Sequence, residues 1–198
     1  MSDKGILNII IAGTGGQGVL TLSNMLRKLA MNKGLKCEGA TFKGGAQRMG
    51  SVYAELRILL DPQSKAYFSS QIPNCSVDVL IGMEPWEALR FANRCNTDTL
   101  SIINSEEEKL YVERYGKTEM IDPIQTLIKV YNSPIIKNYS QLSKELKGSS
   151  KFTNNLMLQE AIQKEYVPFS MEELIAIKTY ERRVNFALLF LCNIVTFI

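Results

Sequence analysis

The feature that most constrains this chain is an apolar stretch that runs directly into a glycine-rich turn and then into a helical pattern. Residues 9–12 are all apolar, and Gly13, Gly15 and Gly18 follow with the spacing G-x-G-x-x-G. Glycines at this spacing permit a tight turn, close approach of a ligand to the backbone, and close packing of a helix on a strand. The helix that follows directs unpaired N–H groups at the turn, where they attract an anion. The turn therefore predicts a backbone surface suited to a phosphate or to another protein.

Two nucleotide-binding interpretations of the turn have weak support. The phosphate loop of nucleoside triphosphatases ends in Lys followed by Ser or Thr, whereas Gly18 precedes Val19 and Leu20. A nicotinamide dinucleotide site uses an acidic residue at the end of the second strand, and Glu38 falls near the start of the candidate strand 36–42. Dinucleotide binding is therefore the weaker alternative to a structural turn or a subunit contact. The first candidates for anion or partner binding are Gly13, Gly15, Gly16, Gln17 and Gly18.

The residues that are absent from the chain exclude several kinds of chemistry. Its 198 residues contain no histidine, which excludes a Ser-His-Asp triad, a Cys-His pair and an imidazole base. The four cysteines form no C-x-x-C pair, so the usual zinc and iron–sulfur patterns are absent. We therefore expect no catalytic residue, no metal site and no cofactor in this chain, and reduced thiols in a cytoplasmic protein.

Charge and hydropathy limit the kinds of partner that we expect the chain to bind. The net charge is only +3, and the basic residues are scattered, which argues against a nucleic-acid surface. No basic segment followed by a long apolar stretch opens the chain, so secretion is not indicated. Residues 186–198 are nearly all apolar but fall short of the ~20 residues that a membrane-spanning helix needs. We expect no membrane insertion, and we expect this segment to dock on a partner.

The order of the predicted elements indicates an α/β fold. After the first strand, helical periodicity covers 22–31, and strands are predicted at 36–42, 51–60, 77–82 and 99–103. A returning hairpin arm is predicted at 65–68, after a turn at 61–64. The remaining predicted helices are 84–93, 123–131, 140–146, 154–164 and 171 to the end of the chain. We predict a Rossmann-like, mostly parallel sheet with flanking helices and a helical C-terminal part. The chain is predicted to be a single domain of residues 1–198, with an α/β core at 1–121 and a mainly helical extension at 122–198.

Two further clusters follow later strands. Residues 43–51 place three glycines around Arg48, whose planar guanidinium binds carboxylate or phosphate in a bidentate way, or pairs with a structural carboxylate. Residues 84–90 follow the strand at 77–82, at the edge where open α/β sheets bind ligands. The only tryptophan, Trp86, suits an interface or core anchor. These clusters add Gly45, Gln47, Arg48, Ser51 and Glu84 to the candidate binding residues.

The three clusters together resemble the gamma-type subunit of 2-oxoacid:ferredoxin oxidoreductases. The resemblance covers residues 8–104 and rests on the turn at 13–18, the segment 45–52, and the strand 77–80 followed by 84–90. The segments 45–52 and 84–90 are most similar to the indolepyruvate oxidoreductase beta subunit. The helical half resembles the family more weakly, at two pairs of residues: Asn154 with Asn155, and Glu181 with Asn185.

The resemblance implies a subunit of an enzyme that oxidatively decarboxylates a 2-oxoacid, such as indolepyruvate, to an acyl-CoA and reduces ferredoxin. A larger catalytic subunit is expected to carry thiamine diphosphate, Mg and [4Fe-4S] clusters, with CoA as a candidate ligand at the interface. Two alternatives stay open: an independent NAD(P)-dependent or adenylating enzyme, and a scaffold module that forms a homodimer when isolated.

Overall fold

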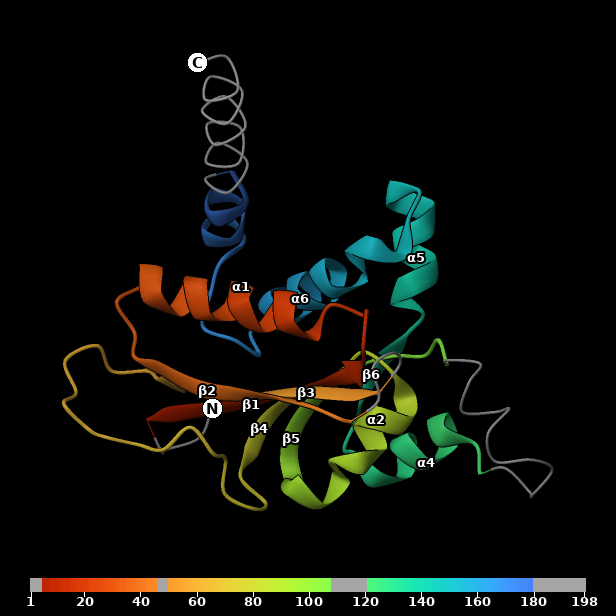
Figure 1. Cartoon of the computed structure of the whole chain (residues 1–198), viewed down its shortest axis with the longest axis horizontal. Coiled ribbons are helices and arrows are strands. Elements are labelled where there is room, and N and C mark those ends of the chain that lie inside the picture. Colours follow the sequence, from red (N-terminus) through yellow and green to blue (C-terminus); the bar gives the residue numbers. More distant parts are fainter. Residues whose placement is uncertain (1–4, 46–49, 108–120, 180–198) are drawn as a thin grey trace, which may run out of the picture.

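The computed structural model describes residues 5–45, 50–107 and 121–179, which form a six-stranded sheet between two helical layers (Figure 1). The strand order is β2-β3-β1-β4-β5-β6. The strands are β1 (Ile6–Thr14), β2 (Cys37–Lys43), β3 (Ser51–Leu59), β4 (Val77–Gly82), β5 (Cys95–Asn104) and β6 (Ile135–Lys137). The helices are α1 (Val19–Asn32), α2 (Pro85–Arg90), α4 (Pro123–Val130), α5 (Tyr139–Lys147) and α6 (Thr153–Gln163), with short 3-10 helices η1 (Ala92–Arg94) and η2 (Ser150–Phe152). The α/β prediction is confirmed.

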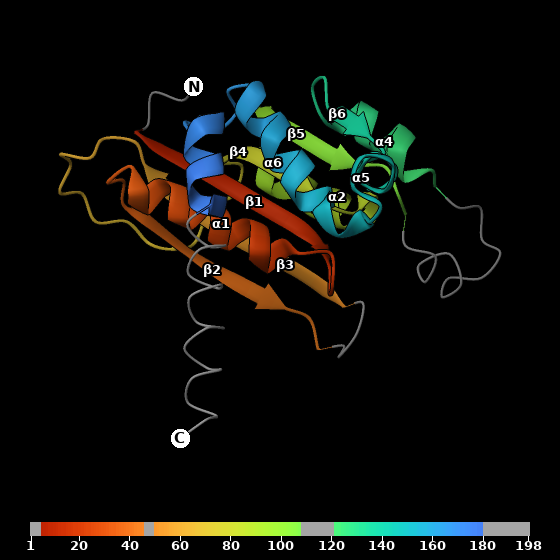
Figure 2. The same ribbon diagram turned by 90° about the horizontal axis from the view of Figure 1, so that it is seen from above.

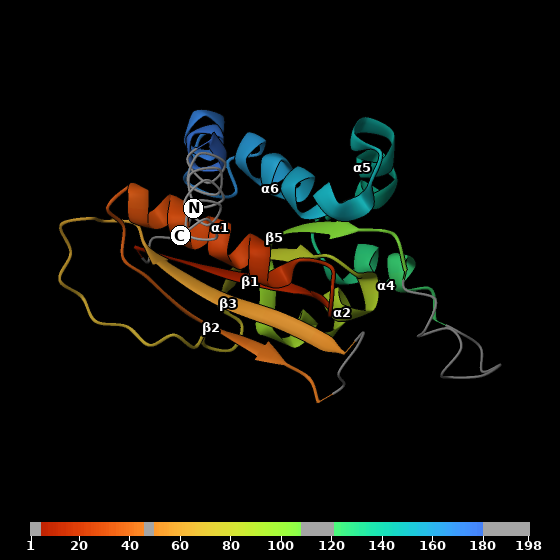
Figure 3. The same ribbon diagram turned by 45° about the horizontal axis from the view of Figure 1, so that its top comes forward.

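Each face of the sheet packs against its own set of helices. Figures 1 and 3 show α1 and α6 above the sheet and α2 and α4 below it. The upper core joins Ile9 and Ile11 of β1 to Leu22 and Leu26 of α1, and the lower core joins Ile10 to apolar residues of α2 and α4. Alternate residues of β1 therefore enter different cores, as the twofold periodicity of a strand requires.

The sheet is mixed, with more parallel than antiparallel pairs. β1 pairs in parallel with β4, β4 with β5, and β5 with β6. β3 runs antiparallel to both β1 and β2. The predicted, mostly parallel sheet is confirmed, and its antiparallel part is β3 with its two neighbours, β1 and β2.

The hairpin arm predicted at 65–68 is wrong. β3 already has β1 on one side and β2 on the other, so no edge of β3 is free for a third strand. Side chains hold the segment instead: Arg57 donates to the carbonyls of Ser69 and Gln71, and Glu55 accepts the N–H of Ile72 at 2.7 Å. The segment is a loop, seen as the wide excursion on the left of Figure 2.

The C-terminal half adds three predicted helices and one strand that was not predicted. The helices α4, α5 and α6 lie within one residue of the predicted bounds. The missed strand, β6, is only three residues long, too short for a periodic signal. Asp122 caps α4 through two backbone N–H groups, which is the cap that Asp122-Pro123 predicts.

The predicted capping box at 170–173 is present. The N–H of Ser170 donates to Glu173 Oε2 at 2.7 Å, and the N–H of Glu173 donates back to Ser170 Oγ at 3.2 Å. Residues 171–179 are helical, and the rest of the helix predicted to the end of the chain lies outside the described residues, as do residues 186–198. Among the helices that the structure describes, none has the length and apolar character needed to cross a bilayer.

Candidate functional site

The three clusters that the sequence singles out meet at one edge of the sheet. β1 and β3 place Thr14 beside Ser51, and the N–H of Gly15 donates to the carbonyl of Gly50 at 2.9 Å. Ser51 Oγ in turn donates to Glu87 of α2 at 2.6 Å. The first glycine turn, the second glycine loop and the start of α2 are therefore linked by hydrogen bonds. Gln47 and Arg48 lie outside the described residues.

Much of the first glycine turn bonds to the protein itself. The N–H of Thr14 donates to Gln17 Oε1 at 2.9 Å, and the N–H of Gln17 donates to the carbonyl of Thr14 at 3.2 Å. Helix geometry leaves the N–H groups of Val19, Leu20 and Thr21 without intrahelical partners. Any anion at this turn would therefore be bound mainly by the first turn of α1, because the turn's own N–H groups are partly used.

Gly18 brings α6 against the start of α1. Its φ of +91° lies in the left-handed region, and a Cβ at this position would stand 2.7 Å from Asn154 Nδ2. That nitrogen donates a long 3.5 Å hydrogen bond to the carbonyl of Gly18. The third glycine of the motif therefore allows α1 and α6 to pack closely, through a contact between residues that are 136 positions apart in the chain.

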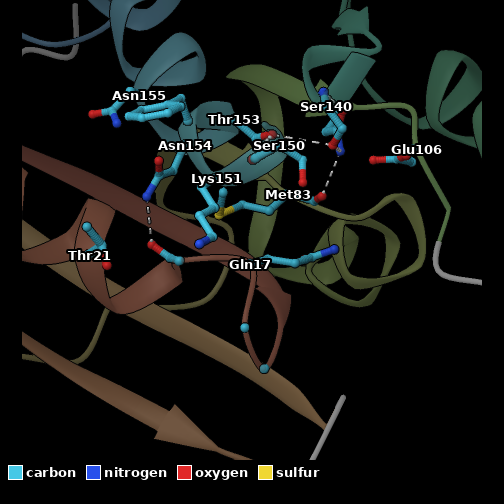
Figure 4. Close-up of a pocket in the computed structure, with 15 residues that line it drawn as sticks. Gln17, Thr21, Met83, Glu106, Ser140, Ser150, Lys151, Thr153, Asn154 and Asn155 are labelled. Carbon is cyan, nitrogen blue, oxygen red and sulfur yellow. Dashed lines mark hydrogen bonds between the residues drawn. The ribbon is translucent and has the colours of Figure 1, made fainter. Parts of the chain in front are cut away.

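A pocket of about 540 Å³ lies at this edge of the sheet, between α1, the ends of β4 and β5, and the η2–α6 segment (Figure 4). Four of the candidate residues line it, namely Gly15, Gly16, Gln17 and Gly18. The other lining residues are Thr21, Met83, Asn104, Glu106, Ser140, Ser150, Lys151, Phe152, Thr153, Asn154 and Asn155. The pocket lies outside the carboxyl ends of β1, β4 and β5, where open α/β sheets bind ligands.

Asn104 organises the wall of the pocket opposite the glycine turn. It is buried at the end of β5 and donates to the carbonyl of Met83 at 3.2 Å and to Ser140 Oγ at 3.0 Å. Its own Oδ1 accepts the N–H of Ser140 at 3.3 Å. The side chain therefore bridges the end of β4 and the start of α5, which fixes this wall relative to the sheet.

The pocket carries charges of both signs on different sides. Lys151 enters it from η2, near the glycine turn, and Glu106 lies on the far side from Thr21 (Figure 4). Glu106 Oε1 accepts Lys144 Nζ at 3.0 Å. The Ser140 hydroxyl lowers the pKa of Glu106 by hydrogen bonding, and Lys144 lowers it further, against the opposing effect of partial burial. Glu106 is therefore an anion at neutral pH.

The remaining candidate residues support the site without lining the pocket. Glu84 is completely buried, and its Oε2 caps α2 by accepting the N–H of Glu87 at 2.8 Å. Gly13 packs closely, since a Cβ there would meet Gln17 Oε1 at 2.7 Å. Ser51 contacts Glu87, and Gly45 is exposed at the end of the described part of its loop.

The strand order argues against the dinucleotide interpretation. β2 is separated from β1 by the antiparallel β3, and Glu38 pairs with Arg57, which pairs with Asn8. Asn8 precedes Thr14 by six residues, so Glu38 lies about 20 Å along the strands from the glycine turn. An acidic residue there cannot reach a ribose bound at the turn.

Several pocket residues gave no signal in the sequence. Asn104 ends a strand like many asparagines, and Ser140 and Thr153 lie in ordinary helix starts. Outside the glycine turn, only Asn154 and Asn155 among the lining residues have a signal in the sequence, through the family resemblance. Across the described ranges, no group of three or more Cys, Asp or Glu side chains is arranged to hold a metal ion.

The fold and the site define a Rossmann-like α/β domain with a candidate ligand site. The sheet is mostly parallel, and a glycine turn, a helix start and a pocket lie at its carboxyl edge. The model of the pyruvate ferredoxin/flavodoxin oxidoreductase family matches residues 8–180, and the chain belongs to this family. The chain is thus a subunit of a multi-subunit 2-oxoacid:ferredoxin oxidoreductase.

A curated relative supports this assignment, and two solved structures have a similar fold. Indolepyruvate oxidoreductase subunit IorB of Archaeoglobus fulgidus is 34% identical over 169 residues, which cover 84% of this chain and 81% of the relative. Pyruvate oxidoreductase subunit PORC of Thermotoga maritima superposes with a TM-score of 0.57 at 17% identity, covering 86% of this chain and 82% of that one. The gamma subunit of a keto/oxoacid ferredoxin oxidoreductase from Geobacter sulfurreducens gives a TM-score of 0.56 at 14% identity, covering 85% and 82%. These two structures share the fold.

Proposed function

We propose that this chain assembles with a larger subunit that carries thiamine diphosphate, Mg and [4Fe-4S] clusters, and that the complex oxidatively decarboxylates indolepyruvate or a related aryl 2-oxoacid. The observation that carries this proposal is the 34% identity to an indolepyruvate oxidoreductase subunit over most of both chains. The lack of histidine and of paired cysteines supports a chain that leaves the redox chemistry to its partner. The complex would act in the cytoplasm.

We further propose that the pocket binds an anionic part of CoA, the acceptor of the acyl group. The start of α1, where the first N–H groups have no intrahelical partners, and the ammonium of Lys151 suit a phosphate. A related 2-oxoglutarate:ferredoxin oxidoreductase from Magnetococcus marinus was solved with CoA and succinyl-CoA bound; it aligns with 91% of this chain at 18% identity, and this chain covers 28% of it.

The assembly is tested by purifying the tagged chain from its native cell. The expected result is a stoichiometric larger chain with the absorbance of iron–sulfur clusters and releasable thiamine diphosphate. Reduction of ferredoxin should then depend on both CoA and an aryl 2-oxoacid. A chain that elutes alone, or a complex that is inactive with every aryl 2-oxoacid, contradicts the proposal.

The CoA site is tested in the same complex by calorimetry with CoA. Lys151→Gln removes a charge from the pocket and should weaken CoA binding about fivefold or more, since a charge-assisted contact to phosphate is lost. Lys147→Gln is the control, because Lys147 is exposed on α5 and is not among the pocket residues. Equal effects of the two substitutions would place CoA elsewhere.

A further inference from the structure

The pocket has two ends of opposite electrostatic character. At one end, the start of α1 and Lys151 favour an anion. At the other end lies the carboxylate of Glu106, which Figure 4 shows on the opposite side from Thr21. Lys144 Nζ lies 3.0 Å from this carboxylate and offsets part of its charge, but the carboxylate still disfavours a phosphate group at this end, because like charges repel.

Glu106 is held in place from several directions. The N–H of the preceding residue, Ser105, donates to the carbonyl of Lys137 at 3.0 Å and so fixes the backbone to β6. Lys144 Nζ binds one carboxylate oxygen at 3.0 Å. Ser140 Oγ accepts from Asn104 at 3.0 Å, so its own proton is free to point at the carboxylate. Lys144 therefore holds the carboxylate directly, Ser140 stabilises its charged form, and the backbone that precedes it is fixed to β6.

The carboxylate nevertheless remains open to a ligand. About 41% of its side-chain surface is exposed, and it faces the pocket. A carboxylate has about four lone-pair sites, and a fixed, solvent-facing acceptor of this kind binds N–H or O–H groups. Such groups occur on the neutral parts of nucleotide-like molecules, as amines, amides and hydroxyls.

We propose that Glu106 is the specificity-determining residue of this pocket: it accepts a hydrogen bond from a neutral N–H or O–H group of the ligand and repels ligands that carry a second anionic group at that end. This inference rests on the proposed CoA site and adds to it the residue that orients the ligand. The anionic end of the ligand lies toward α1, and its hydrogen-bond donors lie toward Glu106.

The test compares two probes in the complex, CoA and inorganic pyrophosphate, which is anionic and lacks such neutral donors. Glu106→Gln keeps the shape of the side chain but removes its charge. Pyrophosphate should then bind about threefold more tightly, because a repulsive charge is lost. CoA should bind about tenfold more weakly, because a hydrogen bond to a charged acceptor becomes a neutral one.

The control is Glu107→Gln, the same change of charge one residue away on a side chain that is not among the pocket residues. It should leave both affinities near the wild-type values. Ser140→Ala provides a second variant, which keeps the charge but removes the orienting hydroxyl; it should weaken CoA binding and leave pyrophosphate binding unchanged.

The outcomes separate this inference from the proposed function. If Glu106→Gln moves both affinities in the same direction, or moves neither, while Lys151→Gln weakens CoA binding and Lys147→Gln does not, the role of Glu106 is overturned and the CoA site stands. If the wild-type complex binds neither probe, both proposals are overturned.

Discussion

Ser51 Oγ donates a 2.6 Å hydrogen bond to Glu87 Oε2, which joins the start of β3 to α2 across 36 residues of sequence. Glu87 is completely buried, and its other oxygen forms an ion pair with Arg90, whose Nε lies 3.2 Å away. A buried carboxylate needs such partners, because an unsatisfied buried charge is costly. The contact therefore stabilises the edge of the sheet at which the three clusters meet.

Ser51→Ala should lower the free energy of unfolding by about 1.5–3 kcal/mol, because a hydrogen bond to a buried charged group is lost. Urea titration followed by circular dichroism measures the change. Ser76→Ala is a matched control, since its hydroxyl only donates to the nearby carbonyl of Asn74 on an exposed loop. A loss of stability no larger than that of the control contradicts the prediction.

Two glycines of the first turn should differ in how much stability the chain loses when each is replaced by alanine. Gly16 and Gly18 both have positive φ angles, so each substitution costs about 1–2 kcal/mol of backbone strain. Only at Gly18 would the new Cβ also meet Asn154, since it would meet nothing within 4 Å at Gly16. We therefore expect Gly18→Ala to be the more destabilising of the two.

Asn154→Ala supplies the double-mutant test of that difference. Removing the amide relieves the overlap, so Gly18→Ala should cost less in the Asn154→Ala background than in the wild-type chain. Equal costs of Gly18→Ala in both backgrounds would show that the contact between α1 and α6 does not set the requirement for glycine.

The loop at 60–76 is predicted to depend on one buried ion pair. Arg94 Nη2 lies 3.1 Å from Glu55 Oε1 and donates to the carbonyl of Ile72 at 2.6 Å. Arg94→Gln leaves the buried Glu55 without its cation, which should cost about 3–5 kcal/mol. Trypsin should then cleave faster after Lys65 in the loop.

A double variant shows whether the effect of Arg94→Gln comes from the unpaired charge of Glu55 or from lost packing of the arginine side chain. Glu55→Gln combined with Arg94→Gln removes both charges, so the double variant should be more stable than Arg94→Gln alone. If the double variant is the less stable of the two, the ion pair does not explain the effect.

Stability should depend on pH through Glu106. Its pKa is lowered in the folded chain, chiefly by Ser140, so the folded state favours the ionised form. This contribution is present above the ordinary glutamate pKa of about 4.3 and is lost as the pH falls through the lowered folded value. Urea titrations at a series of pH values should show wild type and Glu106→Gln converging in acid. A difference that is constant with pH would contradict this.

The fold was predictable where periodicity is strong and local. The apolar run of β1 and the helical spacing of Leu22, Leu26 and Leu29 correspond to buried faces. The capping residues Asp122 and Ser170 also act as predicted, because a cap is a local hydrogen bond. Strand pairing is not local, and for this reason the arm at 65–68 was misassigned.

The candidate site was predictable in part. The glycine turn identified the edge of the sheet, since its residues both follow β1 and precede α1. The opposite wall comes from Asn104, Ser140 and the start of α6, which meet the turn only in three dimensions. Individual polar residues at element ends carry no distinguishing pattern, so sequence reasoning could not assign them to the pocket.

The central position of β1 has a consequence for synthesis of the chain on the ribosome. β1 precedes both of its neighbours in the chain, and its second edge is covered only when β4, ending at Gly82, has been made. At about 5–20 residues per second, the strand waits roughly 3–14 seconds with unpaired N–H and C=O groups along that edge. Residues 9–12 carry no charge and no proline to interrupt pairing with other chains. Nascent chains that stop before β4 should therefore aggregate, and chaperone binding to this strand would protect it until β4 emerges.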